Sequence, residues 1–370
     1  MRLSRILGVA FVAAALITPA AANAQGVADR LTVHGSLNAG YGKSSDLQIY
    51  GLPNDGTADY RIMTLQFRYK ISDNDEFVTQ QLNRRVGDSP LKSAVGDLTT
   101  QWAYWQHATG DFSFKVGRAP LPRGLVNEVR YIGTVLPFFR VPIEYTTEAF
   151  DAVDGAVANA RHSWGRGWST STFGFFGGSE NRSVRATASG LTVRSSRATN
   201  LVGGQAYVDA PGGIRLGLYA DAYERLTDTT HGHRVHVSPS AQIDRDRWMV
   251  RGEFMRETGH VPNSDLKQWY VTGVFRASEK VHFATEHSVE QVRQFTLPKA
   301  PNVDVDGMRQ TGAAINYLVS PATVVKFEHH WAAGYNFESL VPTTAIVSGV
   351  AHVLPPAKSN FWIVSLAVAF

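Results

Sequence analysis

The segment from residue 119 to residue 150 gathers charged side chains of both signs around an apolar run from Tyr131 to Phe139. A loop that stayed in water would have no need of Val135-Leu136-Pro137-Phe138-Phe139, so we predict that this segment folds into an enclosed space. Clusters of charged side chains at a narrow passage set its ion preference. An alternative is that these residues cap the structure or pack against a neighbouring subunit. The residues predicted to form the constriction are Arg118, Arg123, Glu128, Arg130, Arg140 and Glu144, with Glu148 close by.

The histidines offer a second possible chemistry, but no complete catalytic set accompanies them. They cluster at His231, His233 and His236, and again at His329 and His330. The spacing of His231 and His233 would suit a metal, although histidines in an outer loop are more often solvated. No serine elbow of the form Gly-x-Ser-x-Gly and no cysteine is present, which leaves no obvious nucleophile. We therefore predict no enzyme, no cofactor and no metal, and keep a barrel-embedded hydrolase only as the less favoured alternative.

The N-terminus has the pattern of a secretory signal. Arg2 and Arg5 precede an apolar run from Ile6 to Ile17, and Ala22-Asn23-Ala24 forms a small-residue cleavage site. We predict a signal peptide at residues 1–24 and a mature chain that starts at Gln25. No later stretch offers the roughly 18 apolar residues that a membrane-spanning helix needs, so a membrane location would require strands.

Composition and charge narrow the class further. The 36 basic and 32 acidic residues give a net charge of +4, and removal of Arg2 and Arg5 leaves about +2, too little to predict a nucleic-acid partner. No linker or low-complexity tract divides the chain. We therefore predict one domain over residues 25–370.

Segments of about ten residues alternate apolar and polar side chains along the chain, as expected for strands with two different faces. In the first, Leu31 to Tyr41, the apolar positions include Leu37 and the polar ones Ser36. The second, from about Asp59 to Ile71, sets Met63 against Thr64. Recurrent alternation of this kind is typical of transmembrane barrels, where lipid-facing and lumen-facing residues alternate. The predicted fold class is all-β, a transmembrane antiparallel β-barrel.

Short turns and long polar stretches alternate between these segments. Seven turns and eight long stretches predict about sixteen strands, with short turns on the periplasmic side and long loops outside. The third long loop is the one predicted to enter the lumen. The turns are centred at 72–75, 109–111, 164–167, 211–213, 245–247, 278–280 and 320–321, and the long stretches at 42–58, 84–96, 119–150, 178–199, 226–233, 257–264, 291–305 and 333–359.

Aromatic residues and the C-terminal strand support the same arrangement. Barrels carry aromatic girdles where lipid meets water. The final residues alternate from Trp362 to a terminal Phe370, the kind of strand that barrel assembly machinery binds by adding it to a sheet edge. The girdle residues are predicted to be Trp168, Trp248 and Tyr317 beside short turns, and Trp269, Trp331 and Trp362 beside long loops.

A sixteen-stranded barrel is too wide for side chains to fill, which predicts a water-filled channel. Alternation alone predicts a lumen wall with more basic than acidic residues and hence a mild preference for anions. The predicted acidic wall residues are Asp221, Glu253, Glu286 and Glu328. The predicted basic wall residues are Arg68, Lys70, Lys115, Arg215, Arg251, Arg276 and Lys326.

A family resemblance lies around the third loop, in Val116-Gly117-Arg118, Pro122, Gly124-Leu125, Asn127-Glu128, Arg130, Pro137-Phe138, Arg140, Pro142 and Asp154-Gly155. These roughly forty residues resemble the motif shared by phosphate-selective porins and their relatives among Gram-negative general porins. The resemblance implies an outer-membrane homotrimer that selects anions with lysines and arginines at its constriction. Here no lysine occurs in 119–150 and glutamates interrupt the arginines, a departure from the phosphate-selective pattern.

A receptor or adhesin that works through exposed loops is the alternative from another class. The stretch from Gly178 to Ala198 could bind phosphate groups through Arg182, Arg185, Arg194 and Arg197. The predicted partners are outer-membrane lipid and lipopolysaccharide, small hydrophilic solutes or anions, two further copies of the chain, and the assembly machinery through Phe370.

Overall fold

The structure is a computed structural model of the 370-residue chain. It describes residues 29–89, 98–145, 150–187, 190–227, 231–260, 263–294, 303–335, 337–338, 344–347, 350–353 and 355–370. Only the backbone is described at 183–187, 190–191, 194, 260, 263–264, 293–294, 303–306, 344–347 and 350–353. The predicted signal peptide at 1–24, Gln25 and Glu148 lie outside the described residues, and so do the side chains of Arg185 and Arg194.

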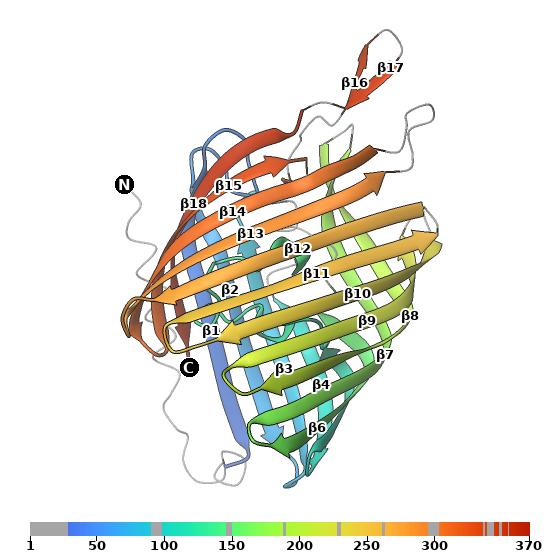
Figure 1. The fold of residues 1–370 in the computed structure, drawn as a ribbon, viewed down its shortest axis with the longest axis vertical. Coiled ribbons are helices and arrows are strands. Elements are labelled where there is room, and N and C mark those ends of the chain that lie inside the picture. Colours follow the sequence, from blue (N-terminus) through green and yellow to red (C-terminus); the bar gives the residue numbers. More distant parts are fainter. Residues whose placement is uncertain are drawn as a thin grey trace.

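Sixteen of the described strands pair in one closed antiparallel barrel, in chain order apart from a separate hairpin (Figure 1). This confirms the predicted fold class and strand number. The hairpin consists of β16 (Thr344–Val347) and β17 (Val350–Val353). The barrel strands are β1 (Leu31–Ser44), β2 (Thr57–Lys70), β3 (Asp75–Val86), β4 (Thr99–Thr109), β5 (Phe112–Pro120), β6 (Ala152–Gly165), β7 (Trp168–Thr187), β8 (Gly190–Ala210), β9 (Ile214–Thr227), β10 (His231–Asp244), β11 (Trp248–His260), β12 (Asn263–Arg276), β13 (Val281–Gln294), β14 (Val303–Ser320), β15 (Thr323–Gly334) and β18 (Ala357–Ala369).

Alternation along each strand separates an apolar outer face from a polar inner face. Leu37 pairs with Met63 in the β1–β2 register, and Met63 is exposed on the outside. The adjacent pair, Ser36 and Thr64, is buried inside the barrel with its hydroxyl oxygens 2.7 Å apart. Because the side-chain period of a strand is two, one register fixes the face of every residue along it.

The terminal strands close the barrel. β1 pairs with β18 from Ser36 opposite Ala369 to Ser44 opposite Phe361. The backbone N–H of Phe370 donates to the carbonyl of Gly35, and the N–H of Gly35 donates back to Phe370. No strand edge is therefore left open at the seam, which removes a site for pairing with other chains.

All seven predicted short turns join consecutive strands at one end of the barrel. Gly213 shows why one of them needs glycine. Its φ is +72°, and an added Cβ would lie 1.9 Å from the carbonyl oxygen of Asp244. A side chain there would meet both backbone strain and a collision.

All eight predicted long loops include the ends of paired strands, and the overlap is largest at four of them. The stretch 178–199 is a hairpin in which β7 and β8 continue pairing from Ser179 opposite Ala198 to Thr187 opposite Gly190. The stretches 226–233, 257–264 and 291–305 likewise contain the ends of paired strands. A hairpin that rises beyond the lipid can be polar on both faces while its backbone stays paired, so polarity alone could not distinguish it from a loop.

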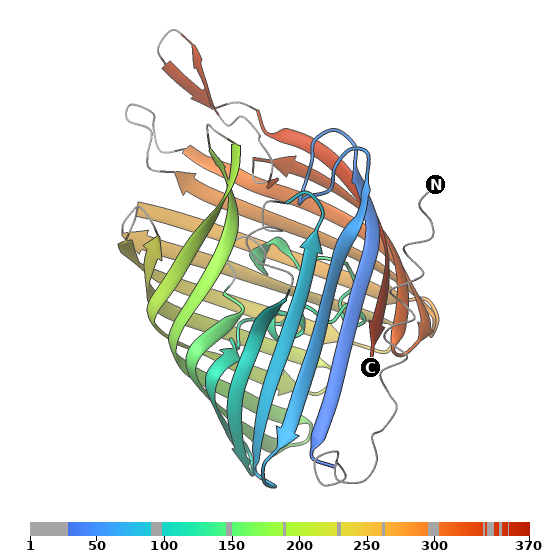
Figure 2. The ribbon, with the colours of Figure 1, turned by 180° about the vertical axis from the view of Figure 1, so that it is seen from behind.

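The segment between β5 and β6 enters the barrel, as the back view shows in green and teal (Figure 2). It contains two short 3₁₀ helices, η1 (Asn127–Val129) and η2 (Ile143–Tyr145). No helix within the described ranges is long and apolar enough to cross a membrane.

The outer surface carries large apolar side chains, with aromatic residues near both ends of the strands. Trp168, Trp248 and Tyr317 are exposed beside short turns, and Trp331 is exposed near the long-loop end. The apolar core lies inside the barrel instead, where the β5–β6 segment packs against inward side chains of the wall. One cluster joins Phe138 of that segment to Ala284 of β13 and Ala314 of β14.

Candidate functional site in the barrel lumen

The lumen loop, defined here as residues 121–145, is attached to the wall at several points around the barrel. The first attachment lies at β8 and β11. The backbone N–H of Gly124 donates to Gln205 Oε1, and the N–H of Leu125 donates to Glu253 Oε1, both at 2.9 Å. Gly124 has a φ of +55°, and an added Cβ would lie 2.0 Å from Glu253 Oε2 and 2.1 Å from the Tyr145 hydroxyl. Only glycine allows the chain to approach the wall this closely.

A second attachment lies at β14 and β15. Lys326 Nζ donates to the carbonyl oxygens of Leu136 at 2.6 Å and Phe138 at 3.3 Å. Asn316 Nδ2 donates to the carbonyl of the intervening Pro137 at 3.0 Å. Three successive carbonyls are thus satisfied by the wall, which matters because buried backbone groups without partners are costly.

Two further contacts attach the lumen loop to β15 and β1, on the side of the barrel where the second attachment lies. The N–H of Phe139 donates to Glu328 Oε1 of β15 at 2.7 Å, and Ser36 Oγ of β1 donates to the carbonyl of Tyr131 at 3.0 Å. β1 and β15 both neighbour β18 in the sheet, whereas β8 and β11 lie on another arc of the barrel. The loop therefore extends across the lumen.

Arg140 joins the lumen loop to other loops at the long-loop end. Its Nη1 donates to the Tyr60 hydroxyl at 3.0 Å, and its guanidinium lies 3.8 Å from the ring centre of Tyr50 in the β1–β2 loop. Its Nη2 lies 3.8 Å from Glu338 Oε1, and Ser89 donates to the same carboxylate. Arg140 thus connects segments that are far apart in the sequence.

Three other predicted constriction residues are buried within the loop or against the wall: Arg123, Arg130 and Glu144. Arg130 Nη2 donates to the carbonyl of Tyr145 at 2.5 Å and Nη1 donates to Asn127 Oδ1 at 3.0 Å. Arg130 therefore holds two parts of the lumen loop together. The spacing of the charged residues in the sequence could not predict these contacts.

Glu144 lies among groups of both signs. Arg123 Nη2 donates to its backbone carbonyl at 3.4 Å, and Ser238 Oγ of β10 donates to Glu144 Oε1 at 3.2 Å. Burial and the nearby Glu253 carboxylate raise the pKa of Glu144 well above its usual range, against the opposing effect of Arg123. Glu144 consequently takes up a proton more readily in the folded protein than in the unfolded chain.

Glu128 differs from the other predicted constriction residues because it is exposed. It lies in η1, and its charge acts on Arg215 of β9 and on Tyr104 of β4. The exposed carboxylate therefore lies within electrostatic reach of Arg215 and Tyr104.

Arg118 lies outside the lumen, so the prediction that it lines the constriction was wrong. It pairs with Ala103 on the strand face that carries Trp105 and Val116, both exposed on the outer wall. Its Nη1 lies 2.7 Å from Asp154 Oδ2. The motif suggested proximity to the loop, but the strand period places residue 118 on the opposite face from residue 117.

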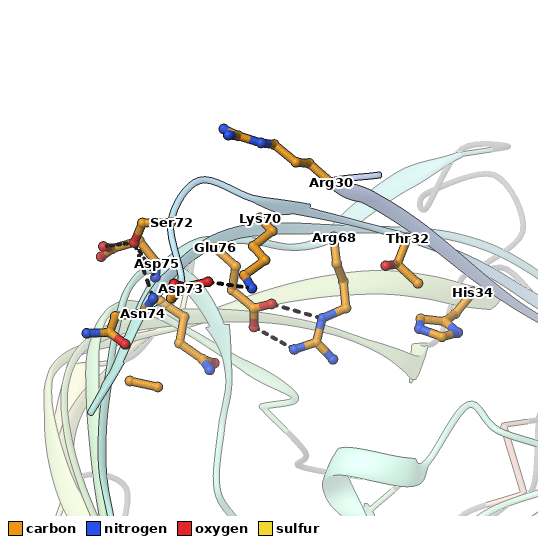
Figure 3. Close-up of a pocket in the computed structure, with 12 residues that line it drawn as sticks. Arg30, Thr32, His34, Arg68, Lys70, Ser72, Asp73, Asn74, Asp75 and Glu76 are labelled. Carbon is orange, nitrogen blue, oxygen red and sulfur yellow. Dashed lines mark hydrogen bonds and ion pairs between the residues drawn. The ribbon is translucent and has the colours of Figure 1, made fainter. Parts of the chain in front are cut away.

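Arg68 and Lys70 line a pocket of about 390 Å³ at the short-turn end (Figure 3). Arg68 faces Glu76, with Nη2 2.5 Å from Oε1 and Nε 3.2 Å from Oε2. Lys70 Nζ reaches Asp73 at 2.9 Å. Thr32 lines the same pocket from β1, directly across from Arg68. Both cations line this pocket, and each is paired with a carboxylate.

The remaining predicted wall residues divide by exposure. Arg215 pairs with Asp209 at 2.6 Å and Arg276 pairs with Asp244 at 2.8 Å, near the short turns. Lys115 lies with its Nζ 5.5 Å from the ring centre of Tyr104. These three side chains are partly or fully exposed.

Arg251 and Lys326 are buried, and so are the predicted acidic wall residues Asp221, Glu253, Glu286 and Glu328. Arg251 lies between Gln242 and Thr272 in the β10–β12 register. Lys326 holds the lumen loop, as do Glu253 and Glu328. The predicted wall set therefore contains a buried group, of which Lys326, Glu253 and Glu328 hold the loop, and an exposed group that meets the aqueous lumen.

Several of the described histidines lie beside carboxylates, and His236 is buried between Asp221 at 3.1 Å and Glu257 at 2.6 Å. His231 and His233 both contact Glu224, at 3.3 and 3.1 Å, on the β9–β10 hairpin. His330 is buried 2.9 Å from Glu328, whereas its neighbour His329 lies on the other strand face. Within the described part of the chain, no group of three or more metal-ligating side chains is placed to hold a metal ion.

Sequence reasoning missed several residues that position the lumen loop: Gln205, Asn316, Tyr60, Tyr50 and Glu338. For Gln205 and Asn316 a signal existed, because both are polar and occupy inward positions of their strands. Nothing in the sequence indicated which inward side chains the loop would reach.

No family model matches the sequence, and no curated protein matches it. Solved structures do match over most of the chain. An anion-selective porin from Comamonas acidovorans superposes with a TM-score of 0.59 at 10% identity, over 92% of this chain and 99% of that one. The outer-membrane channel DcaP of Acinetobacter baumannii gives 0.59 at 9% identity, over 92% and 97%. OmpF of Salmonella typhi in complex with daunomycin gives 0.59 at 12% identity, over 92% and 97%.

These similarities agree with the closed sixteen-stranded barrel. The chain has the porin-like fold of barrels that reside in the bacterial outer membrane.

Proposed function

We propose that this protein is an outer-membrane porin, a water-filled channel for passive diffusion of small hydrophilic solutes and ions. The observation that carries the proposal is the lumen loop, which is attached at β8 and β11 on one arc of the wall and at β14 and β15 on another. A loop held in this way narrows a barrel that would otherwise be wide. Because its carbonyls are satisfied by the wall, the narrowing is a fixed feature of the fold.

The path for solutes lies beside the exposed Glu128 and past Arg68, Lys115 and Arg215 of the wall. Charged groups in a low-dielectric cleft focus their field on small ions. Since Arg68 and Arg215 are each paired with a carboxylate, the basic excess is small and the preference for anions is mild. Arg123, Arg130, Arg140 and Glu144 shape the constriction by holding the loop in place.

The protein is proposed to act without catalysis and as a homotrimer. The similarity of the fold to solved porins and outer-membrane channels supports the first point. A trimer form is recorded for OmpT of Vibrio cholerae, which superposes with a TM-score of 0.56 at 10% identity, over 92% of this chain and 99% of that one. The Arg118–Asp154 ion pair on the outer wall also favours a protein neighbour, because charges on a lipid-facing surface are destabilising.

Single-channel recording of the refolded mature protein in a planar bilayer under a salt gradient tests the proposal. We expect stepwise openings and a reversal potential that leans toward anions. Folded protein that inserts and stays silent would overturn the channel assignment. Light scattering of the detergent complex measures the subunit number, and a monomer would overturn the trimer.

Shortening the lumen loop tests its role directly. Deletion of residues 130–140 removes the β14 and β15 attachments, and we expect about a twofold or larger rise in conductance as the passage widens. The matched control deletes residues 184–193 from the tip of the β7–β8 hairpin, where the conductance should not change. Equal conductance in both variants would show that the lumen loop does not limit flow.

A further inference from the structure

The inner wall between β4 and β8 carries an aromatic strip, defined here as Tyr104, Phe173 and Tyr207. Gln205 of β8 marks the inner face, because it accepts the backbone N–H of Gly124 of the lumen loop at 2.9 Å. Phe173 lies opposite Gln205 in the β7–β8 register, and Tyr207 lies two positions further along β8. Cross-strand pairs and residues two positions apart share one face of a sheet. Both rings therefore belong to the inner wall.

Lys115 lies on the same inner face, next to the strip. It pairs with Val157 of β6, and Val157 pairs in turn with Phe175 of β7. Phe175 is two positions from Phe173, so all of these side chains share one face. The Nζ of Lys115 lies 5.5 Å from the ring centre of Tyr104 on the neighbouring β4. A cation and aromatic rings thus follow one another across adjacent strands.

The rings of Phe173 and Tyr207 form a half-buried aromatic surface. Their centres are 6.3 Å apart and their planes meet at 87°, the edge-to-face arrangement that aromatic pairs favour. The Tyr207 hydroxyl donates to the carbonyl of Gly124, and the Arg215 guanidinium lies 5.1 Å from the Tyr207 ring centre. Tyr207 is therefore held in place from two sides. Fixed, half-buried rings offer a stacking surface to a flat solute group.

Two charges beside the strip, Lys115 and Glu128, have no ion-pair partner within the described part of the chain. Arg215, in contrast, is paired with a carboxylate. Glu128 is exposed and lies within electrostatic reach of Tyr104, Tyr207 and Arg215, which belong to β4, β8 and β9. A carboxylate that reaches these three strands lies beside the strip. One charge of each sign is thus available next to the rings.

We propose that the aromatic strip is a binding subsite for zwitterionic aromatic amino acids. The carboxylate of the solute contacts Lys115, its ammonium group contacts Glu128, and its ring stacks on Phe173 and Tyr207. A simple anion would meet the repulsion of Glu128, and a simple amine would meet that of Lys115. The subsite names a solute class for the proposed channel and therefore rests on the proposed function.

Block of single channels by phenylalanine tests the proposal. The refolded mature protein is recorded in a planar bilayer at neutral pH with phenylalanine and with three analogues that each lack one group. Phenylpropionate lacks the ammonium group, phenylethylamine lacks the carboxylate, and alanine lacks the ring. We expect phenylalanine to interrupt the current at a concentration about tenfold lower than any analogue, as the loss of one contact implies.

The outcomes separate the subsite from the channel. Stepwise openings that phenylalanine and its analogues interrupt equally would overturn the subsite and leave the channel standing. Folded protein that inserts and stays silent would overturn the proposed function and the subsite with it.

Three variants assign each group of the solute to its residue. Lys115→Met should abolish the preference for phenylalanine over phenylethylamine, because the carboxylate then has no cation to contact. Glu128→Gln should abolish the preference over phenylpropionate, and Phe173→Leu should abolish the preference over alanine. In each variant the other two preferences should persist, which a general distortion of the lumen would not produce.

Matched controls carry the same substitutions outside the lumen. Lys280→Met and Glu279→Gln change exposed residues of the β12–β13 turn, and Phe283→Leu changes an exposed ring of the outer wall. All three controls should keep the wild-type preferences. If Lys115→Met, Glu128→Gln and Phe173→Leu opened in steps and kept those preferences as well, the proposal would be overturned.

Discussion

The lumen loop attachment and the short-turn mouth use the same kinds of charged residue in different ways. At the mouth, Lys70 and Arg68 pair with carboxylates and stay in contact with water. At the attachment, Lys326 is fully buried and donates to backbone carbonyls of the loop. Both lysines occupy inward positions of their strands. A wall lysine that meets the lumen loop stabilises the structure. A wall lysine that meets water contributes to the electric field of the lumen.

The largest expected effect comes from removing Lys326. Lys326→Met leaves the carbonyls of Leu136 and Phe138 without their donor, which costs on the order of 2 kcal/mol. We expect lower resistance to urea and irregular conductance levels as the loop loosens. Lys70→Met is the control, where loss of an exposed pair costs at most about 1 kcal/mol. Similar losses of stability in both variants would contradict the distinction between buried and exposed wall lysines.

Gly124→Ala should have the next largest effect. A Cβ at Gly124 meets Glu253 and Tyr145, whereas Gly110 has nearly the same φ, +54°, and open space around it. Both substitutions bear the backbone strain of about 1 kcal/mol, and only Gly124→Ala adds the collision. Urea unfolding of the two variants measures the difference. If Gly110→Ala proved as destabilising, the close approach of the loop to β11 would not be what requires glycine.

A smaller effect concerns pH. The pKa of Glu144 is raised by burial and by Glu253, so its protonated form contributes stability that is fully present below the ordinary glutamate range and is lost as pH rises through the raised pKa. Glu144→Gln mimics the protonated form. We expect its melting temperature to exceed the wild-type value by a few degrees at pH 8, with the gap closing on acidification. Glu128→Gln, at an exposed site, is the control, and a gain in melting temperature there as large as that of Glu144→Gln would contradict the prediction.

The smallest effects are expected on ion preference. Arg215→Ser removes an exposed wall cation and should shift the reversal potential toward cations, whereas Glu128→Gln should shift it toward anions. Arg123→Gln, at a buried position, should leave the reversal potential unchanged while lowering stability. Reversal potentials of the three variants under one salt gradient make the comparison. A shift in Arg123→Gln as large as that in Arg215→Ser would mean that the buried arginine contributes to the field of the lumen.

Sequence periodicity could predict the barrel because the alternation of apolar and polar side chains is contained within each strand. The alternation of Leu37 with Ser36, and of Met63 with Thr64, is local, and it assigns faces before any partner strand is known. The short turns are local as well. The predicted lengths of β7 and β8 were wrong at 178–199. Backbone pairing above the lipid depends on the partner strand and not on an apolar face.

The amino-acid sequence by itself determined the fold class, the turns and the face of each wall residue, since a period of two residues needs no distant contact. Only the tertiary structure decided which inward residues meet the lumen loop. Lys326 and Leu136 are 190 positions apart, and no local pattern relates them. Arg118 is a different case, because the local strand period already places it on the face opposite Lys115 and Gly117, and the prediction for it relied on the motif instead. Burial arises from packing between distant segments, and burial assigned each charge its role.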